Sequence, residues 1–165
     1  MLTKLLRRET CADCKLCCQF NSYDIWNTPV LNAEVLAKVR DLLPEARFLQ
    51  KGEDAWLFRV EEFDAEDNFT CPLLDPERGC LLGAEKPLMC SIWPFQLMEA
   101  QGELCIALSP LCSAVLQLPM DTLLRFAKEE LAGMVFAYAD AHPAEVLPYD
   151  GVTPILVWRK ESMNL

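Results

Sequence analysis

The sequence predicts a small α+β domain, and three observations lead to that prediction. The chain has 165 residues, of which 52% are hydrophobic and 24% charged, which is enough apolar material for one buried core. Two stretches carry apolar residues at helical spacing, and shorter stretches are rich in aromatic and branched residues. The cysteines are concentrated in segments that show neither pattern. We therefore expect a single domain over residues 1–165, with two main helices, a short antiparallel sheet and long cysteine-rich loops.

The first helix is expected directly after Asn32. The side chain of Asn32 is a suitable N-cap, Leu31 and Leu36 fit a hydrophobic staple, and Glu34 lies in the first turn, where a negative charge is favourable. Pro44 ends the helical pattern. The expected apolar face consists of Val35, Leu36, Val39, Leu42 and Leu43.

The second helix is expected over residues 121–141, and Pro143 lies just beyond its end. Its apolar stripe consists of Leu124, Ala127, Leu131, Met134, Val135 and Tyr138.

The strands are expected in four short segments. Residues 95–100 and 103–108 are joined by Gln101 and Gly102, which predicts a hairpin with glycine in its turn. The other two strands are residues 55–60 and residues 155–158.

Composition and charge exclude several classes of function. The net charge of −10 opposes binding to nucleic acid and to anionic membranes. We find no apolar run behind the charged N-terminal residues and no stretch near the ~20 apolar residues of a spanning helix, so we expect a cytoplasmic protein. In that reducing compartment, the nine cysteines are expected to bind metal rather than to form disulfides.

Four cysteines lie within eight residues, at Cys11, Cys14, Cys17 and Cys18. Thiolates this close repel one another, so their arrangement indicates a cation between them, either a divalent metal or an iron–sulfur cluster. Cys11, Cys14 and Cys17 have the C-x-x-C-x-x-C spacing of ferredoxin-type sites, whose fourth cysteine is often followed by proline, as Cys71 is here. Zinc can equally take two of these sulfurs and two distant ones in a tetrahedron.

The basic residues Lys4, Arg7, Arg8 and Lys15 flank these cysteines and are expected either to offset thiolate charge or simply to be solvated. Cys18 has three possible roles: to bind a second ion, to bridge two ions, or to pack as a small hydrophobic residue.

The middle of the chain supplies Cys71, Cys80 and Cys90. Each lies beside a turn former or a rigid apolar residue, and Asp75, Pro76 and Gly79 predict a turn between the first two. Leu73, Leu81, Ile92 and Trp93 are expected to shield the centre from water.

Together these motifs resemble the CxxCxxCC family of zinc- or iron-chelating, YkgJ-type cysteine-cluster proteins. The resemblance covers residues 10–113 and is followed by the C-terminal helix and strand in residues 119–160. It rests on the first cysteine group, Cys71-Pro72-x-Leu74, Gly79-Cys80 and Pro87-x-x-Cys90-x-x-Trp93-Pro94-Phe95. It implies eight candidate metal ligands: Cys11, Cys14, Cys17, Cys18, Cys71, Cys80, Cys90 and Cys112.

This chain departs from the family in two places, with Lys86 where arginine is common and Trp93 where phenylalanine is common. The cluster motifs are also similar to part of the bacterial flagellin lysine methylases, which implies an iron–sulfur option.

Other residues with possible chemistry are expected to be structural. Cys105 lies in a predicted strand and is interpreted as a packing residue. His142, the sole histidine, precedes Pro143 at a helix end, where its charge suits the helix dipole. Asp64, Glu66 and Asp67 match no calcium-binding loop and are expected to form a solvated turn.

Three functions remain after this reading. The first is a cytoplasmic metal-binding protein whose centre is structural or stores metal. The second is an iron–sulfur redox protein or enzyme. The third is a metal-stabilised interaction module that docks a basic partner through Asp64, Glu66 and Asp67. The spacing and the resemblance favour iron in the cell, whereas aerobic expression favours zinc in a crystal.

Overall fold

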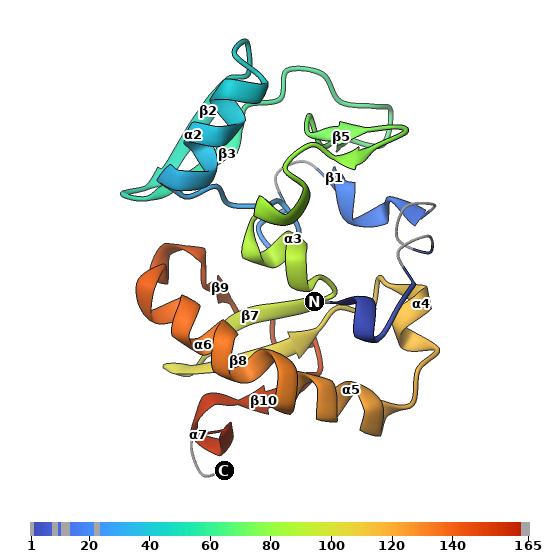
Figure 1. Cartoon of the computed structure of the whole chain (residues 1–165). Coiled ribbons are helices and arrows are strands. Elements are labelled where there is room, and N and C mark those ends of the chain that lie inside the picture. The colour runs from blue at the N-terminus through green and yellow to red at the C-terminus, as the bar shows by residue number, and fades with distance from the viewer. Residues whose placement is uncertain (1, 8–9, 11–13, 22–23, 163–165) are drawn as a thin grey trace. The chain divides into compact units, whose positions relative to one another are not determined.

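The computed structural model describes residues 2–7, 10, 14–21 and 24–162. Helices and small, mainly antiparallel sheets make up the described chain, so the predicted α+β class is confirmed (Figure 1). The contacts divide the chain into two compact units, residues 8–91 and residues 1–7 with 92–165. The expectation of one domain over residues 1–165 stays a prediction.

The unit of residues 8–91 is built from one longer helix and three two-stranded antiparallel sheets. Its sheets pair β1 (Gln19–Asn21) with β4 (Asn68–Thr70), β2 (Phe48–Gly52) with β3 (Ala55–Phe58), and β5 (Leu74–Asp75) with β6 (Gly79–Cys80). Its helices are η2 (Leu16–Cys18), α2 (Ala33–Leu42), η3 (Gly83–Glu85) and α3 (Leu88–Ile92), the last ending at the boundary of the unit.

The first predicted helix is confirmed as α2. The Asn32 side chain accepts a hydrogen bond from the Val35 N–H at 3.0 Å, as an N-cap should. Val35 and Val39 face the core, but Leu42 is 46% exposed, so its assignment to the apolar face was wrong. Leu42 lies in the last turn of the helix, where the core no longer covers it.

The core of this unit lies between α2 and the strands. The β2–β3 hairpin packs beside α2, and Leu31 bridges to Trp56 through two backbone hydrogen bonds of 2.8 and 2.9 Å (Figure 1). The buried residues of this core are Phe20, Leu31, Val35, Leu36, Val39, Phe58, Phe69, Cys71, Leu73 and Leu82.

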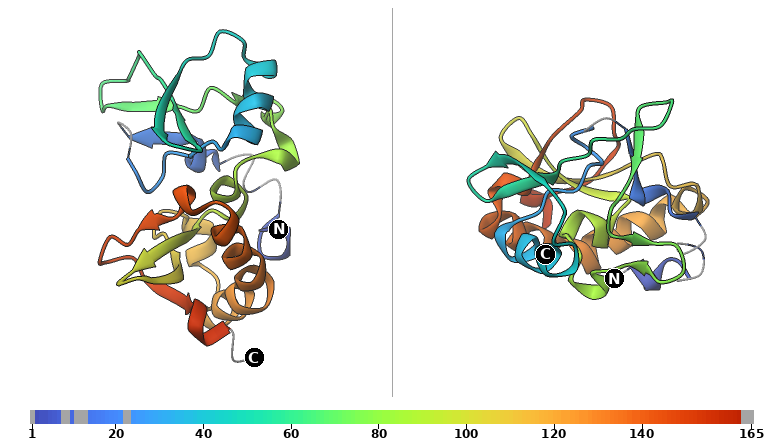
Figure 2. Two further views of the ribbon diagram at one scale, coloured as in Figure 1. Left: turned by 90° about the vertical axis from the view of Figure 1, so that its left-hand side faces the viewer. Right: turned by 90° about the horizontal axis from the view of Figure 1, so that it is seen from above.

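The second unit is a four-stranded sheet with helices over one face (Figure 2). The strand order is β10-β8-β7-β9, from β7 (Phe95–Ala100), β8 (Glu103–Leu108), β9 (Leu147–Pro148) and β10 (Ile155–Trp158). Its helical segments are η1 (Leu2–Lys4), α4 (Ser113–Leu116), α5 (Met120–Phe126), η4 (Ala127–Leu131), α6 (Ala132–Ala141), η5 (Pro143–Glu145) and α7 (Arg159–Ser162).

The predicted β7–β8 hairpin and the late strand β10 are confirmed. Gln101 and Gly102 both have positive φ, 56° and 79°, which suits the right-handed twist of a tight hairpin. The expectation of an antiparallel sheet needs one correction, because β9 pairs parallel to β7. The predicted strand over residues 55–60 is the shorter β3, whose partner β2 was not predicted.

The second predicted helix is confirmed as a run of α5, η4 and α6, in which η4 is a single π turn. The ring of Phe126 lies 5.5 Å from that of Phe95, which packs α5 onto β7. Of the predicted stripe, Ala127, Leu131 and Val135 are buried, whereas Leu124, Met134 and Tyr138 are only half-buried. The bulky Phe126 and Phe136 are buried instead, which rotates the buried face by about one residue.

No helix among the described residues combines the length and the hydrophobicity that crossing a bilayer requires.

Candidate metal centre

Cys17 and Cys18 lie in the short helix η2, which follows a residue with a strained backbone. Lys15 has φ 51°, and its carbonyl accepts a hydrogen bond from the Cys18 N–H at 2.9 Å. This turn folds the chain back so that strand β1 begins directly after Cys18. The turn therefore fixes both cysteines at the start of a paired strand.

Strand pairing then brings Cys71 next to Cys18. Gln19 of β1 is opposite Thr70 of β4, and the Cys71 N–H donates a hydrogen bond of 2.8 Å to the Cys18 carbonyl. Cys71 itself is only 9% exposed and belongs to the core of its unit. A ladder between residues 47 to 51 positions apart in sequence thus joins the first and second cysteine groups.

Cys80 is placed by the small β5–β6 hairpin. The Asp75 carboxylate accepts hydrogen bonds from the N–H groups of Glu77 and Arg78 at 2.9 and 2.7 Å, and Gly79 has φ 77°. These contacts confirm the predicted turn. Cys80 lies opposite Leu74, and the Leu74 N–H bonds back to the Cys71 carbonyl at 2.9 Å. The β5–β6 hairpin therefore brings Cys80 back towards the segment that carries Cys71.

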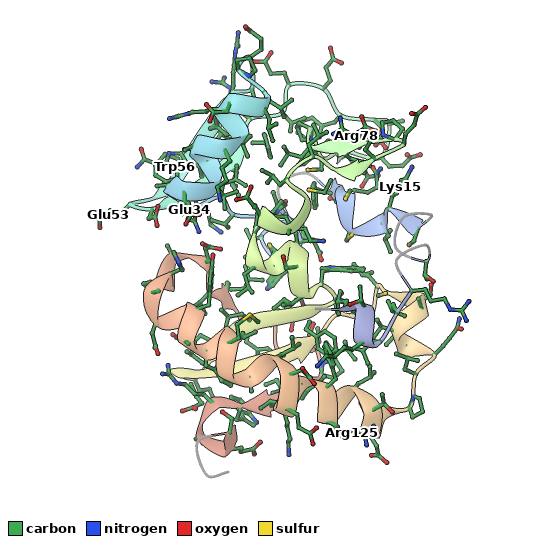
Figure 3. All side chains as sticks on the ribbon, viewed as in Figure 1. Lys15, Glu34, Glu53, Trp56, Arg78 and Arg125 are labelled. Carbon is green, nitrogen blue, oxygen red and sulfur yellow. The ribbon has the colours of Figure 1, made fainter. Side chains whose placement is uncertain are left out.

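Cys90 lies in α3, one helical turn after Pro87. The Ser91 N–H donates to the Pro87 carbonyl at 3.0 Å, which begins the helix at the proline. The positive charge of the preceding residue, Lys86, partly offsets the rise in the pKa of Cys17 and of Cys90. Figure 3 shows sulfur atoms (yellow) gathered beside β1 and the β5 hairpin.

The described thiols of the two cysteine groups affect one another's ionisation. Burial, with smaller contributions from the charges of Cys80 and Cys17, raises the pKa of Cys71 to about 11, although a backbone hydrogen bond from Leu73 partly opposes this rise. Burial also raises the pKa of Cys90, with additional contributions from the charges of Cys71, Cys80 and Cys17. Charge effects of this kind place these sulfurs in the same region of the unit.

Cys17 and Cys18 have different roles, as adjacent residues are expected to have. The Cys17 thiol donates a hydrogen bond to the Cys18 sulfur, which raises the pKa of Cys17 and lowers that of Cys18. Burial raises the pKa of Cys17 further, whereas the charges of Cys71, Cys90 and Cys80 oppose ionisation of Cys18. Cys18 is thus influenced by the other thiols, and it also packs, partly buried, against the apolar core of its unit.

We call Cys17, Cys18, Cys71, Cys80 and Cys90 the thiol cluster. Each of the eight described cysteines has a free thiol. Among the described residues, no three histidine, cysteine or acidic side chains already stand in the geometry of a metal-ion site. Thus the sulfurs are neighbours but are not arranged as a completed set of ligands.

The other candidate ligands, Cys11, Cys14 and Cys112, are not part of the thiol cluster. Cys14 is exposed, and Cys11 lies outside the described residues. Cys112 is buried in the unit of residues 92–165, directly before α4. Cys105 is fully buried in β8 opposite Met98, and burial raises its pKa to about 11. This burial agrees with the packing role expected for Cys105.

Of the four apolar residues that were expected to shield the metal centre from water, two are buried. Leu73 and Ile92 are buried, whereas Leu81 and Trp93 are half-buried. Trp93 opens the segment that turns into β7, so its ring is not held in a regular element.

The sequence pattern did not single out Lys86, the base whose charge acts on Cys17 and Cys90. It pointed to Lys4, Arg7, Arg8 and Lys15, but Lys4 pairs with Glu130 at 2.6 Å and Lys15 bonds the Pro76 carbonyl at 2.7 Å. Arg8 lies outside the described residues. Lys86 acts on the thiols instead, and its position four residues before Cys90 was the available signal.

His142 lies at the end of α6, as predicted. Its ring stacks on Tyr138 at 4.3 Å, and its Nδ1 lies 3.8 Å from the Glu145 carboxylate. The Tyr138 hydroxyl donates to the same carboxylate at 2.7 Å. These contacts hold η5 against α6, and the sequence argument did not foresee them.

Comparison with models of protein families, with curated proteins and with solved structures gives no match for this chain. The resemblance to the CxxCxxCC family therefore stays a prediction that rests on the motifs alone.

Proposed function

We propose that this chain is a metal-binding protein whose cysteines hold zinc or an iron–sulfur cluster. The observation that carries the proposal is the thiol cluster, in which sulfurs from four separate segments of one unit influence one another's ionisation. Cys11 and Cys14, which precede the cluster in the C-x-x-C-x-x-C motif, are proposed as further ligands. Cys112 is retained as a ligand candidate from the family resemblance.

The chemistry of the donor set supports a soft or borderline cation. Sulfur ligands favour zinc and iron–sulfur clusters over magnesium or calcium, which prefer oxygen. Gathering buried thiols raises their pKa values because several neighbouring thiolates would repel one another. A cation reverses that effect, since it stabilises the thiolates and releases their protons. A bound cation would therefore allow these thiols to ionise together.

The spacing of the ligands favours an iron–sulfur cluster in the cell. Three cysteines in C-x-x-C-x-x-C and a fourth followed by proline match the ferredoxin-type pattern. Such a cluster supplies one-electron chemistry, whereas zinc supplies stability to the fold. We propose a structural or metal-storage role in the cytoplasm, and a redox role as the second candidate if iron is bound.

The test is metal analysis of the full-length protein purified without oxygen. We expect zinc, or iron with acid-labile sulfide, at a fixed stoichiometry near or above one per chain. An iron–sulfur cluster gives a brown protein that bleaches on reduction. Colourless protein with stoichiometric zinc would support the metal site and exclude the redox role.

Three cysteine variants link the metal to the thiol cluster. Cys80→Ser and Cys90→Ser are expected to lose at least half of the bound metal, because each removes a sulfur from the cluster. Cys105→Ala is the matched control, since it removes a buried thiol of the other unit and should keep the metal content. Protein that is purified without oxygen, holds no metal and stays folded, with Cys17, Cys18 and Cys80 open to a thiol reagent, would contradict the proposal.

A further inference from the structure

A groove of about 570 Å³ lies on the unit of residues 8–91, at the open end of the β2–β3 hairpin. The hairpin continues beyond its strands through a hydrogen bond of 2.7 Å from the Arg59 N–H to the Arg47 carbonyl. One wall is formed by residues 45–47 and 58–62, and the other by residues 69, 70 and 72. We call this feature the hairpin groove.

The floor of the hairpin groove is apolar. Phe58 and Phe69 belong to the core but line the groove, together with half-buried Val60 and exposed Pro72. Phe63 extends this surface, because its ring packs edge-on against Phe69 at 5.6 Å while 38% of the residue remains exposed. Because Phe58 and Phe69 are only 3% and 6% exposed, the apolar surface that meets a side chain from outside comes mainly from Val60, Phe63 and Pro72.

The rim of the groove is charged. Arg47 and Glu61 neutralise each other at 2.8 Å. Glu45 and Glu62 are exposed and, within the described chain, form no ion pair. Arg59 is the other base on the rim.

The chain around the groove adds negative potential. Residues 61–67 contain five carboxylates and no base, and residues 53–77 contain nine acidic residues against Arg59 alone. Asp64 accepts hydrogen bonds from the N–H groups of Glu66 and Asn68 at 2.9 and 2.8 Å, which holds this acidic loop in one shape. A partner that approaches the groove therefore meets a net negative field from an ordered loop.

We propose that the hairpin groove binds a short extended peptide that carries a lysine or arginine next to a large apolar side chain. The apolar side chain lies on Val60, Phe63 and Pro72, above the buried rings of Phe58 and Phe69, and the cation lies by Glu62 and Glu45. The groove is more open than enclosed, which suits a peptide laid across it better than a small molecule, since small molecules need to be mostly enclosed. The partner is thus a basic, partly apolar protein segment, independent of which metal the thiol cluster holds.

The test is selection of peptides from a random phage-displayed 12-residue library on the full-length, metal-loaded protein. The best peptide is then made synthetically with a fluorescent label, and its Kd is measured by anisotropy at fixed ionic strength. We expect the selected peptides to be enriched in lysine or arginine beside leucine, phenylalanine or tryptophan.

Two single charge reversals decide whether the peptide lies in the groove. Glu62→Lys on the rim is expected to weaken binding at least fivefold. Glu53→Lys, in the β2–β3 turn outside the groove lining, makes the same charge change and is expected to alter Kd less than twofold. Both residues are exposed, so both variants should keep the melting temperature and metal content of the wild type. Thr70→Trp, which narrows the groove from the other wall, should also weaken binding.

Four results would overturn the proposal. One is a selection without basic and apolar enrichment, and another is an equal loss of affinity in Glu62→Lys and Glu53→Lys, which indicates a general charge effect. A third is full affinity in Thr70→Trp. The fourth is self-association of the wild type that Glu62→Lys abolishes, which would make a second copy of the chain the occupant.

Discussion

At the scale of single residues, burial determines how the thiol of Cys105 titrates. The residue is fully buried in β8, and burial raises its pKa from 9.0 to about 11. In the unfolded chain this thiol ionises near pH 9, whereas in the folded chain it stays protonated until about pH 11. Its contribution to stability is therefore fully present below pH 9 and is lost as the pH rises to about 11.

This titration gives the first prediction. Cys105→Ala is expected to cost about 1 kcal/mol at pH 8 through lost packing. It should also reduce the fall in the free energy of unfolding between pH 9 and pH 11. Urea unfolding at a series of pH values measures both effects. A wild type and a variant with parallel pH profiles would show that the Cys105 thiol is not shielded from water.

The cap of α2 gives the second prediction. Asn32→Ala removes the acceptor for the Val35 N–H and is expected to lower the free energy of unfolding by about 1 kcal/mol. Asp41→Ala, an exposed change at the other end of the same helix, is expected to alter it by less than about 0.5 kcal/mol. Chemical denaturation of both variants is the measurement. Equal changes in the free energy of unfolding would show that Asn32 does not stabilise α2 as an N-cap.

At the scale of secondary-structure elements, the two glycines Gly102 and Gly133 respond oppositely to the same substitution. Gly102 has φ 79° in the β7–β8 turn, so Gly102→Ala is expected to destabilise the chain by about 1 kcal/mol. Gly133 lies exposed in α6 with room for a methyl group, so Gly133→Ala is expected to stabilise it by about 0.5–1 kcal/mol. Thermal melts that move in the same direction for both variants would contradict this account of the turn.

The elements that the sequence predicts are those specified by local signals. The cap at Asn32, the apolar spacing that follows it and the Gln101-Gly102 turn all lie within a few residues of the structure they define. The strands that were missed, such as β1, β4 and β9, are two or three residues long and exist only through partners distant in sequence. Because their pairing depends on the folded chain, no local sequence pattern predicts these strands.

The same distinction explains what was foreseen of the candidate site. The cysteines can be read directly from the sequence. The β5–β6 turn can be predicted from it because Asp75 and Gly79 specify that turn locally. The contact of Cys18 with Cys71 depends on the β1–β4 ladder, and the influence of Lys86 on Cys17 depends on the folding of distant segments. The order of the cysteine motifs therefore suggested which thiols come together, but the spacing of the cysteines in the sequence could not establish it.

At the scale of the whole molecule, the thiol cluster belongs to one of the two compact units. The unit of residues 8–91 has short strands and many turns, so a bound metal should supply a large part of its stability. The unit of residues 92–165 instead has a four-stranded sheet covered by helices, together with its own buried core. The proposed metal should therefore affect the two units unequally.

Removal of the metal provides the prediction at this scale. After chelation, backbone amides in residues 14–21 and 68–91 are expected to exchange with deuterium at least tenfold faster, because the segments around the thiol cluster lose their shared cation. Amides of β7 and β8 should change less than twofold. Hydrogen exchange with mass spectrometry measures both, and unchanged protection throughout the chain would exclude a structural metal.

The central claim is that sulfurs of the thiol cluster share a cation, and X-ray absorption at the zinc or iron edge tests it most directly. For the anaerobically purified full-length protein, we expect a first coordination shell dominated by sulfur at about 2.3 Å. In Cys90→Ser that shell should lose sulfur, whereas in Cys105→Ala it should be unchanged. A first shell of nitrogen and oxygen at about 2.0–2.1 Å, or protein that retains no metal, would contradict the account.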